Sequence, residues 1–133
     1  MNRAGSPTRS ITELDLVWLA AVSMNASPLH VDAHRAAESP TGKPLVLGAL
    51  TVAIAEGLAS QLSDGRLGPP IGWEKISLRA PVHVGDVIRV EATDLAPDKA
   101  QPHGPRRVRT RAFVRDHELA AELITLFRPA DDR

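Results

Sequence analysis

The sequence contains no cysteine and no tyrosine, and aromatic residues make up only 3% of its 133 residues. Without cysteine, disulfide scaffolds, thiolate nucleophiles, zinc knuckles and iron–sulfur sites are all excluded. An excess of charge of either sign is also absent, because 16 basic side chains match 16 acidic ones. We therefore expect no nucleic-acid partner, since no overall positive field draws phosphates to the protein.

Long apolar runs are scarce as well. The most prominent one, residues 46–62, is somewhat too short for a membrane span and is interrupted by Glu56. No apolar run follows the arginines among residues 1–10, so no secretory signal is predicted. We therefore expect a cytoplasmic protein with no membrane partner.

The composition itself is that of a globular protein, with 43% hydrophobic and 24% charged residues. A chain of this length is expected to form one core rather than two. Residues 1–10 carry Gly5 and Pro7 among polar neighbours, which predicts a flexible N-terminus or a short edge segment. Residues 11–133 are predicted to form a single domain.

The first half of the chain has helical periodicity. Thr12 and Asp15 have the spacing of a capping box, and apolar residues recur behind them at helical spacing. This pattern predicts a helix near 12–24, and a shorter helix is predicted near 32–38. Residues 46–62 are apolar on all sides, which indicates a helix buried inside the domain.

The second half alternates between apolar and polar residues, a pattern typical of strands, after a loop rich in glycine and proline at 65–72. The side chains expected to face the core are Ile76, Leu78, Ala80, Ile88, Val90, Ala92, Val108, Thr110, Ala112, Val114, Leu119, Ala121, Leu123, Thr125 and Phe127. One buried helix followed by consecutive antiparallel strands predicts an α+β fold, with a curved sheet wrapped around a central helix.

Three segments carry the most specific motifs: SMNASPLHVDAHRAA (23–37), PLVLGAL (44–50) and LRAPVHVGDVIRV (78–90). With them the chain resembles the hot-dog fold, and within it the MaoC-like dehydratases and R-specific enoyl-CoA hydratases, over about residues 11–128. The catalytic stretch of that family reads roughly Asp-x-Asn-Pro-x-His-x-Asp, and a glycine opens the central helix eighteen residues after the histidine. His30 and Gly48 keep this spacing.

The resemblance implies interconversion of 3-hydroxyacyl and trans-2-enoyl thioesters in fatty-acid or polyketide metabolism. The substrate would be carried on coenzyme A or an acyl carrier protein. His30 would act as an acid–base group, and the N–H of Gly48, with Ala49 beside it, would polarise the thioester carbonyl. No cofactor is implied, and the other histidines lack the spacing of metal ligands. A homodimer, or a heterodimer with another hot-dog subunit, is expected.

The chain departs from the family at the catalytic aspartate, which falls on Asn25. An amide can hydrogen-bond a water molecule but cannot accept a proton at neutral pH. Glu56, eight residues after Gly48, is the candidate replacement, with Asn25 orienting Glu56 or the water. Two alternatives stay open: Glu56 as a structural anchor paired with an arginine such as Arg79, and Asn25 as a helix cap.

Two other functions are compatible with these residues. The pattern Gly48-Ala49…Ala55-Glu56 resembles that of acyl-CoA thioesterases, in which the glutamate activates water or attacks the carbonyl. The loss of the aspartate at Asn25 would instead suit a catalytically silent hot-dog subunit that supports an active partner.

A row of arginines forms one more candidate feature. The alternating residues Arg107, Arg109 and Arg111 are predicted to project from one face of one strand. This face is either a solvated outer surface balanced by glutamates, or a docking surface. In the second case it would bind coenzyme A phosphates or the acidic helix of a carrier protein.

Overall fold

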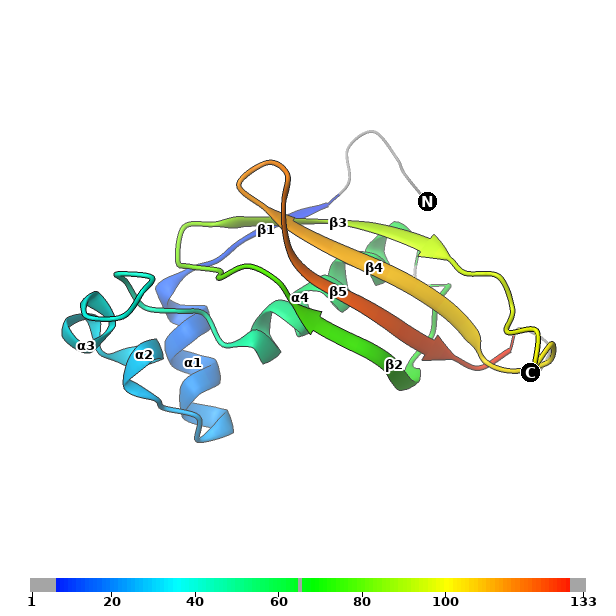
Figure 1. The fold of residues 1–133 in the computed structure, drawn as a ribbon, viewed down its shortest axis with the longest axis horizontal. Helices are drawn as coiled ribbons and strands as arrows, with labels where there is room; N and C mark the ends of the chain where they lie inside the picture. Colours follow the sequence, from blue (N-terminus) through cyan, green and yellow to red (C-terminus); the bar gives the residue numbers. More distant parts are fainter. Residues whose placement is uncertain (1–6, 65, 130–133) are drawn as a thin grey trace.

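The structure is a computed structural model that describes residues 7–64 and 66–129. Figure 1 shows helices and strands in the order expected of an α+β fold. The elements are β1 (Thr8–Ser10), α1 (Glu13–Ser23), α2 (Pro28–Val31), α3 (Ala33–Ala37), α4 (Gly48–Leu62), β2 (Pro70–Leu78), β3 (Val87–Asp94), β4 (Arg106–Val114) and β5 (Glu118–Phe127). Residues 1–6 of the predicted N-terminal segment lie outside the described residues.

Among the described residues, five strands form one antiparallel sheet in the order β1-β3-β4-β5-β2. The β4–β5 hairpin lies inside the sheet, and its register places Val114 opposite Glu118 and Arg106 opposite Phe127. The short strand β1 forms one edge, with Thr8 opposite Arg89, and the longer strand β2 forms the other edge. Figure 1 shows the sheet as a twisted layer with α4 lying along one of its faces.

The core lies between α4 and this face of the sheet. The helix contributes the buried side chains of Ala55, Leu58 and Leu62, and the sheet contributes residues that alternate along each inner strand. The expected inward positions of β3 and β4 are all buried: Ile88, Val90, Ala92, Val108, Thr110, Ala112 and Val114. On β5, Ala121, Leu123, Thr125 and Phe127 are buried, and Leu119 is half-buried. Each large apolar side chain stabilises the fold by about 1.5–3 kcal/mol when it is fully buried.

The edge strand β2 differs from the prediction in two ways. It begins at Pro70, so residues assigned to the preceding loop belong to the strand. Ile76 and Leu78, expected to face the core, are 48% and 57% exposed. The prediction was wrong because alternation identifies the apolar face of a strand, but not whether a neighbouring element covers that face. The central helix is likewise covered on one side only, and Ala49, Ala53, Gly57 and Gln61 are exposed.

Helices α1, α2 and α3 form an N-terminal lobe, residues 13–37, beyond one end of the sheet (Figure 1). The predicted capping box is confirmed, since Asp15 N–H donates to Thr12 Oγ1 (3.3 Å) and Thr12 N–H donates to Asp15 Oδ2 (2.8 Å). Leu16 and Ala20 of α1 pack with Leu47, the residue before α4. This small apolar cluster fixes the lobe against the first turn of the central helix.

Candidate active site

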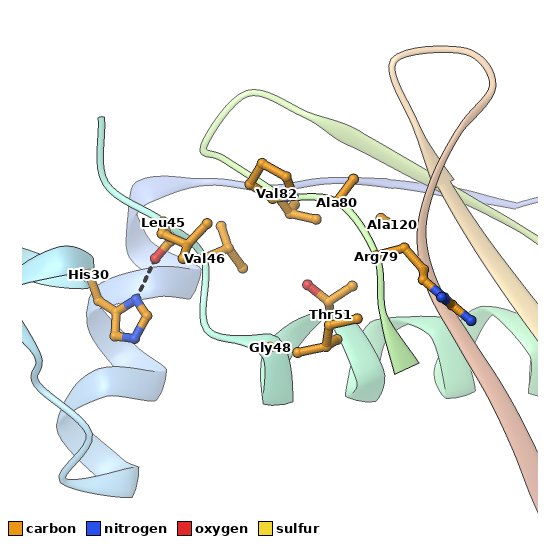
Figure 2. A pocket seen from close by; sticks show the side chains of 11 residues that line it. His30, Leu45, Val46, Gly48, Thr51, Arg79, Ala80, Val82 and Ala120 are labelled. Atoms are coloured by element: carbon orange, nitrogen blue, oxygen red, sulfur yellow. Dashed lines mark hydrogen bonds between the residues drawn. The ribbon is translucent and has the colours of Figure 1, made fainter. Parts of the chain in front are cut away.

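A cavity of about 300 Å³ lies where the lobe, the start of α4 and the end of β2 meet. Figure 2 shows His30 from α2 on one side and Gly48 with Thr51 from the first turn of α4 on another. Leu78 and Arg79 close it from the β2 side. The two residues that the resemblance implies for the site, His30 and Gly48, therefore line the same cavity.

His30 is held in a defined orientation by one backbone carbonyl. Its Nδ1 lies 2.6 Å from the carbonyl oxygen of Leu45. A carbonyl only accepts, so Nδ1 must carry a proton, and in the neutral ring Nε2 then keeps its lone pair. His30 is thereby arranged to accept a proton at Nε2.

Residues 44–46 connect the lobe to the sheet side of the cavity. Leu45 N–H donates to Leu29 O, and Val46 N–H donates to Val82 O, each at 2.8 Å. A second histidine, His83, is only 5% exposed and holds the carbonyl oxygen of Pro44 through Nδ1 at 2.8 Å. This structural role was not predicted from the sequence. His83 lacks the spacing of a metal ligand, and its partner Pro44 lies 39 positions away in the chain.

Gly48 begins α4 and presents the free N–H groups of a helix N-terminus. Leu50 and Thr51 donate to the carbonyl oxygen of Leu47. Within the described chain the N–H groups of Gly48 and Ala49 make no hydrogen bond, so they are available to a ligand. Ala49 itself is exposed. A Cβ at position 48 would collide with Leu78 Cδ1, so only glycine fits here without a rearrangement. The arrangement suits binding of a carbonyl oxygen at the positive end of the helix.

Asn25 and Glu56 lie apart from this pair in the single chain. Asn25 is exposed after the end of α1, where its backbone N–H donates to Ser23 Oγ at 3.3 Å. Glu56 lines a different cavity and accepts hydrogen bonds at Oε1 from Trp73 Nε1 (2.6 Å) and Thr125 Oγ1 (3.3 Å). Neither the expected contact between Asn25 and Glu56 nor the alternative pair with Arg79 is formed. The Trp73 partner was not predicted, because it comes from an edge strand whose register the sequence did not reveal.

The arginine row lies on the outward side of β4, opposite the buried positions. Arg107 forms a bidentate pair with Glu74, with both N–O distances 2.7 Å, and this hydrogen bonding lowers the pKa of the Glu74 carboxyl. Arg111 Nη2 lies 3.1 Å from Glu91 Oε2. Within the described part of the chain, Arg109 takes part in no salt bridge.

Two further features concern ligands and membranes. Within residues 7–64 and 66–129, no group of three or more His, Asp or Glu side chains is placed to bind a metal ion. None of the helices in the same part of the chain has both the length and the apolar character needed to cross a bilayer.

The sequence matches a known protein family. The sequence profile described as "MaoC like domain" matches residues 1–112. The chain belongs to this family. It is 31% identical to the 3-hydroxybutyryl-CoA dehydratase of Methylorubrum extorquens over 96 residues, which cover 68% of this chain and 59% of the relative.

The MaoC-like chain is also similar to the (R)-specific enoyl-CoA hydratase of Aeromonas caviae, with 37% identity over 87 residues and 64% of each chain covered. The solved structure of that hydratase superposes with a TM-score of 0.77 over 92% of both chains, at 26% identity. Our chain thus spans about three fifths of the length of these curated relatives.

A more distant structure shares the hot-dog fold alone. It is the truncated HadBC complex, a 3R-hydroxyacyl-ACP dehydratase of Mycobacterium tuberculosis. It matches with a TM-score of 0.72 at 14% identity, covering 92% of our chain and 90% of that chain.

Proposed function

We propose that this MaoC-like protein interconverts 3-hydroxyacyl and trans-2-enoyl thioesters. The observation that carries the proposal is the cavity in which His30 and Gly48 meet. In it, His30 has Nδ1 fixed by Leu45 O, and Gly48 has a free N–H. The names of the hydratase and dehydratase relatives support the same chemistry.

In the proposed mechanism, hydration proceeds with a single acid–base group. The thioester carbonyl oxygen accepts a hydrogen bond from Gly48 N–H, and His30 Nε2 takes a proton from water as the water oxygen bonds to C3. The electrons of the C2=C3 bond move onto the carbonyl oxygen, where the helix N-terminus stabilises the enolate. His30 then returns the proton to C2, and dehydration follows the same steps in reverse.

A second acid–base group remains a hypothesis. Glu56 lies eight residues after Gly48, which is about 12 Å along α4, so the single chain favours His30 acting alone. A loss of turnover of about 100-fold or more in Glu56→Gln, with a short substrate, would support a catalytic Glu56. Asn25→Asp would show whether restoring the aspartate of the family adds activity.

The decisive experiment is hydration of crotonyl-CoA, followed by the loss of enoyl absorbance. We expect His30→Ala to lower kcat by about 100-fold or more, because the acid–base group is removed. His34→Ala on α3 is the matched control, since His34 is exposed and does not line the cavity. Release of free thiol would indicate a thioesterase instead. No reaction with any thioester would indicate the silent subunit, a reading that the replacement of the family's aspartate by Asn25 supports.

We further propose that two hot-dog subunits pair through β2. Within residues 7–64 and 66–129 this strand has one unpaired edge, and it exposes Ile71, Trp73, Ile76 and Leu78. An apolar strand edge of this kind is a template for pairing with another chain. The partner is a second copy or another hot-dog subunit, as the name of the HadBC complex suggests for that protein.

The carrier of the acyl group is proposed to be coenzyme A or an acyl carrier protein. Because Arg107 and Arg111 are already paired with glutamates, the arginine row is largely neutralised. Arg109 is the member best suited to a phosphate or an acidic helix. A cytoplasmic location remains a prediction.

A further inference from the structure

A second cavity, of about 230 Å³, lies under the later turns of α4. We call it the distal cavity. Its lining includes Glu56, Ser60, Thr110, Thr125, Leu67 and Phe127. A carboxylate and three hydroxyl-bearing side chains thus line a space that is otherwise bounded by apolar residues, which is unusual for a pocket meant only for a hydrocarbon.

The carboxylate of Glu56 is only half satisfied by the protein. Both of its hydrogen bonds, from Trp73 Nε1 and from Thr125 Oγ1, end on Oε1. Glu56 Oε2 accepts no hydrogen bond from any described residue. No buried side-chain polar atom in the described part of the chain lacks a partner, so Oε2 must be accessible.

Ser60 and Thr110 add polar capacity to the same space. Their hydroxyl oxygens make no hydrogen bond within the described chain, although Thr110 is only 2% exposed. Because each unpartnered polar atom is accessible, we take the hydroxyl of Thr110 to face the cavity that the residue lines. The distal cavity therefore offers one anionic acceptor and two hydroxyls that both donate and accept.

The distal cavity and the cavity of His30 lie along the same two elements. Both are bounded by α4, one at Gly48 and the other at Glu56, about 12 Å apart along the helix. Both are also bounded by β2, one at Leu78 and the other at Pro70. An extended chain of about ten bonds spans this distance. A thioester bound at Gly48 could thus place the far end of its acyl chain at Glu56.

We propose that the distal cavity binds an acyl chain whose far end carries a hydrogen-bond donor, such as a hydroxyl group, in preference to a plain alkyl end. An alkyl end would displace water from Oε2 and leave a desolvated carboxylate without a donor, which is costly. A hydroxyl donates to Oε2 and accepts from Ser60 or Thr110. This assignment of substrate class rests on the proposed thioester chemistry.

The test compares two substrates that differ only in the last atom of the chain. They are (E)-10-hydroxydec-2-enoyl-CoA and (E)-undec-2-enoyl-CoA, in which a methyl group replaces the hydroxyl. We expect the protein to prefer the hydroxylated substrate by at least about tenfold in kcat/KM. Glu56→Leu should abolish or reverse the preference, and Ser60→Ala should reduce it. The preference is a ratio within each variant, so a general loss of turnover cancels.

The matched control is Gln61→Leu, an equally drastic change on the exposed side of α4, which should keep the preference. A wild-type preference for the methyl end, or an unchanged ratio in Glu56→Leu, would overturn the proposal. If neither substrate turns over, calorimetric titration with both acyl-CoAs tests the distal-cavity proposal independently of the hydratase proposal. Tighter binding of the hydroxylated chain, lost in Glu56→Leu, supports the distal-cavity proposal, and equal binding overturns it. The crotonyl-CoA assay decides the hydratase proposal separately.

Discussion

At the residue scale, the space next to Gly48 sets what the cavity can accept. A side chain at this position would push against Leu78, which is itself 57% exposed and therefore able to move. The collision is thus relieved by rotating Leu78 into or away from the cavity, rather than by shifting the backbone. A side chain at position 48 should therefore disturb the position of the substrate more than it lowers the free energy of unfolding.

We therefore expect Gly48→Ala to lower kcat/KM for crotonyl-CoA by about tenfold to a hundredfold, because the carbonyl oxygen is displaced from the helix N-terminus. The free energy of unfolding should change little, as measured by urea denaturation. Gly57→Ala is the matched comparison for stability. A Cβ there meets nothing within 4 Å, so it should stabilise α4 by about 0.5–1 kcal/mol. Full activity in Gly48→Ala would contradict the proposed carbonyl site.

Site residues could be predicted where they belong to a motif of fixed spacing, but not where tertiary packing sets their partners. His30 and Gly48 were predicted from the resemblance, because they keep the family's spacing of eighteen residues, and both residues line one cavity. The positions of Asn25 and Glu56 could not be found in this way. Helical spacing gives the distance of Glu56 along α4, but its partner Trp73 is set by the packing of a strand that follows a loop.

At the element scale, the N-terminal end of α1 is held by reciprocal hydrogen bonds between Thr12 and Asp15. The Thr12 backbone N–H, helped by the Thr12 hydroxyl and by Arg9, lowers the pKa of the Asp15 carboxyl. A carboxyl whose pKa is lower in the folded state stabilises the fold above its unfolded pKa, and this contribution is lost as the pH falls through the folded pKa. The capping box therefore acts at neutral pH and fails in acid.

Asp15→Asn should lower the free energy of unfolding by about 1 kcal/mol at neutral pH. The difference from the wild type should shrink as the pH is lowered below the pKa of Asp15, because the wild-type carboxyl then takes up a proton. Urea denaturation at a series of pH values measures both effects. Glu13→Gln, an exposed acidic residue of the same first turn, should give a smaller change. A pH-independent difference would show that the charge of Asp15 does not matter.

The inward faces of the strands were predicted correctly where the strand lies inside the sheet and one face is buried. The inner strands β3, β4 and β5 each have a paired strand on both sides and one face packed against the core, so the alternation of Val90 or Leu123 reports a covered face. For β2 the same alternation failed, since the described chain leaves Ile76 and Leu78 about half exposed. The alternation identifies the apolar face of β2 correctly. That face is either exposed to solvent or covered by another chain.

At the scale of the whole molecule, this uncovered edge leads to a prediction about self-association. Ile76→Lys places a charge on the apolar edge of β2 and should weaken strand pairing between subunits. We expect the apparent dissociation constant of the dimer to rise by about tenfold or more, as measured by sedimentation velocity. Val22→Lys on α1 is the control, because Val22 is similarly exposed but lies in the lobe. A wild-type protein that stays monomeric at high concentration would exclude the β2 dimer.

The attachment of the lobe at residues 44–46 has one more consequence. His30 belongs to the lobe, whereas Gly48 begins α4, which packs on the sheet. The two parts are joined by the Leu16–Ala20–Leu47 cluster and a few backbone hydrogen bonds. A unit with so few buried contacts can open on its own at a lower free energy than the sheet. Opening it would carry His30 away from the thioester while every strand stays paired. Catalytic competence would then depend on a sub-global folding unit, and it would be lost in conditions where hydrogen exchange still shows a protected sheet.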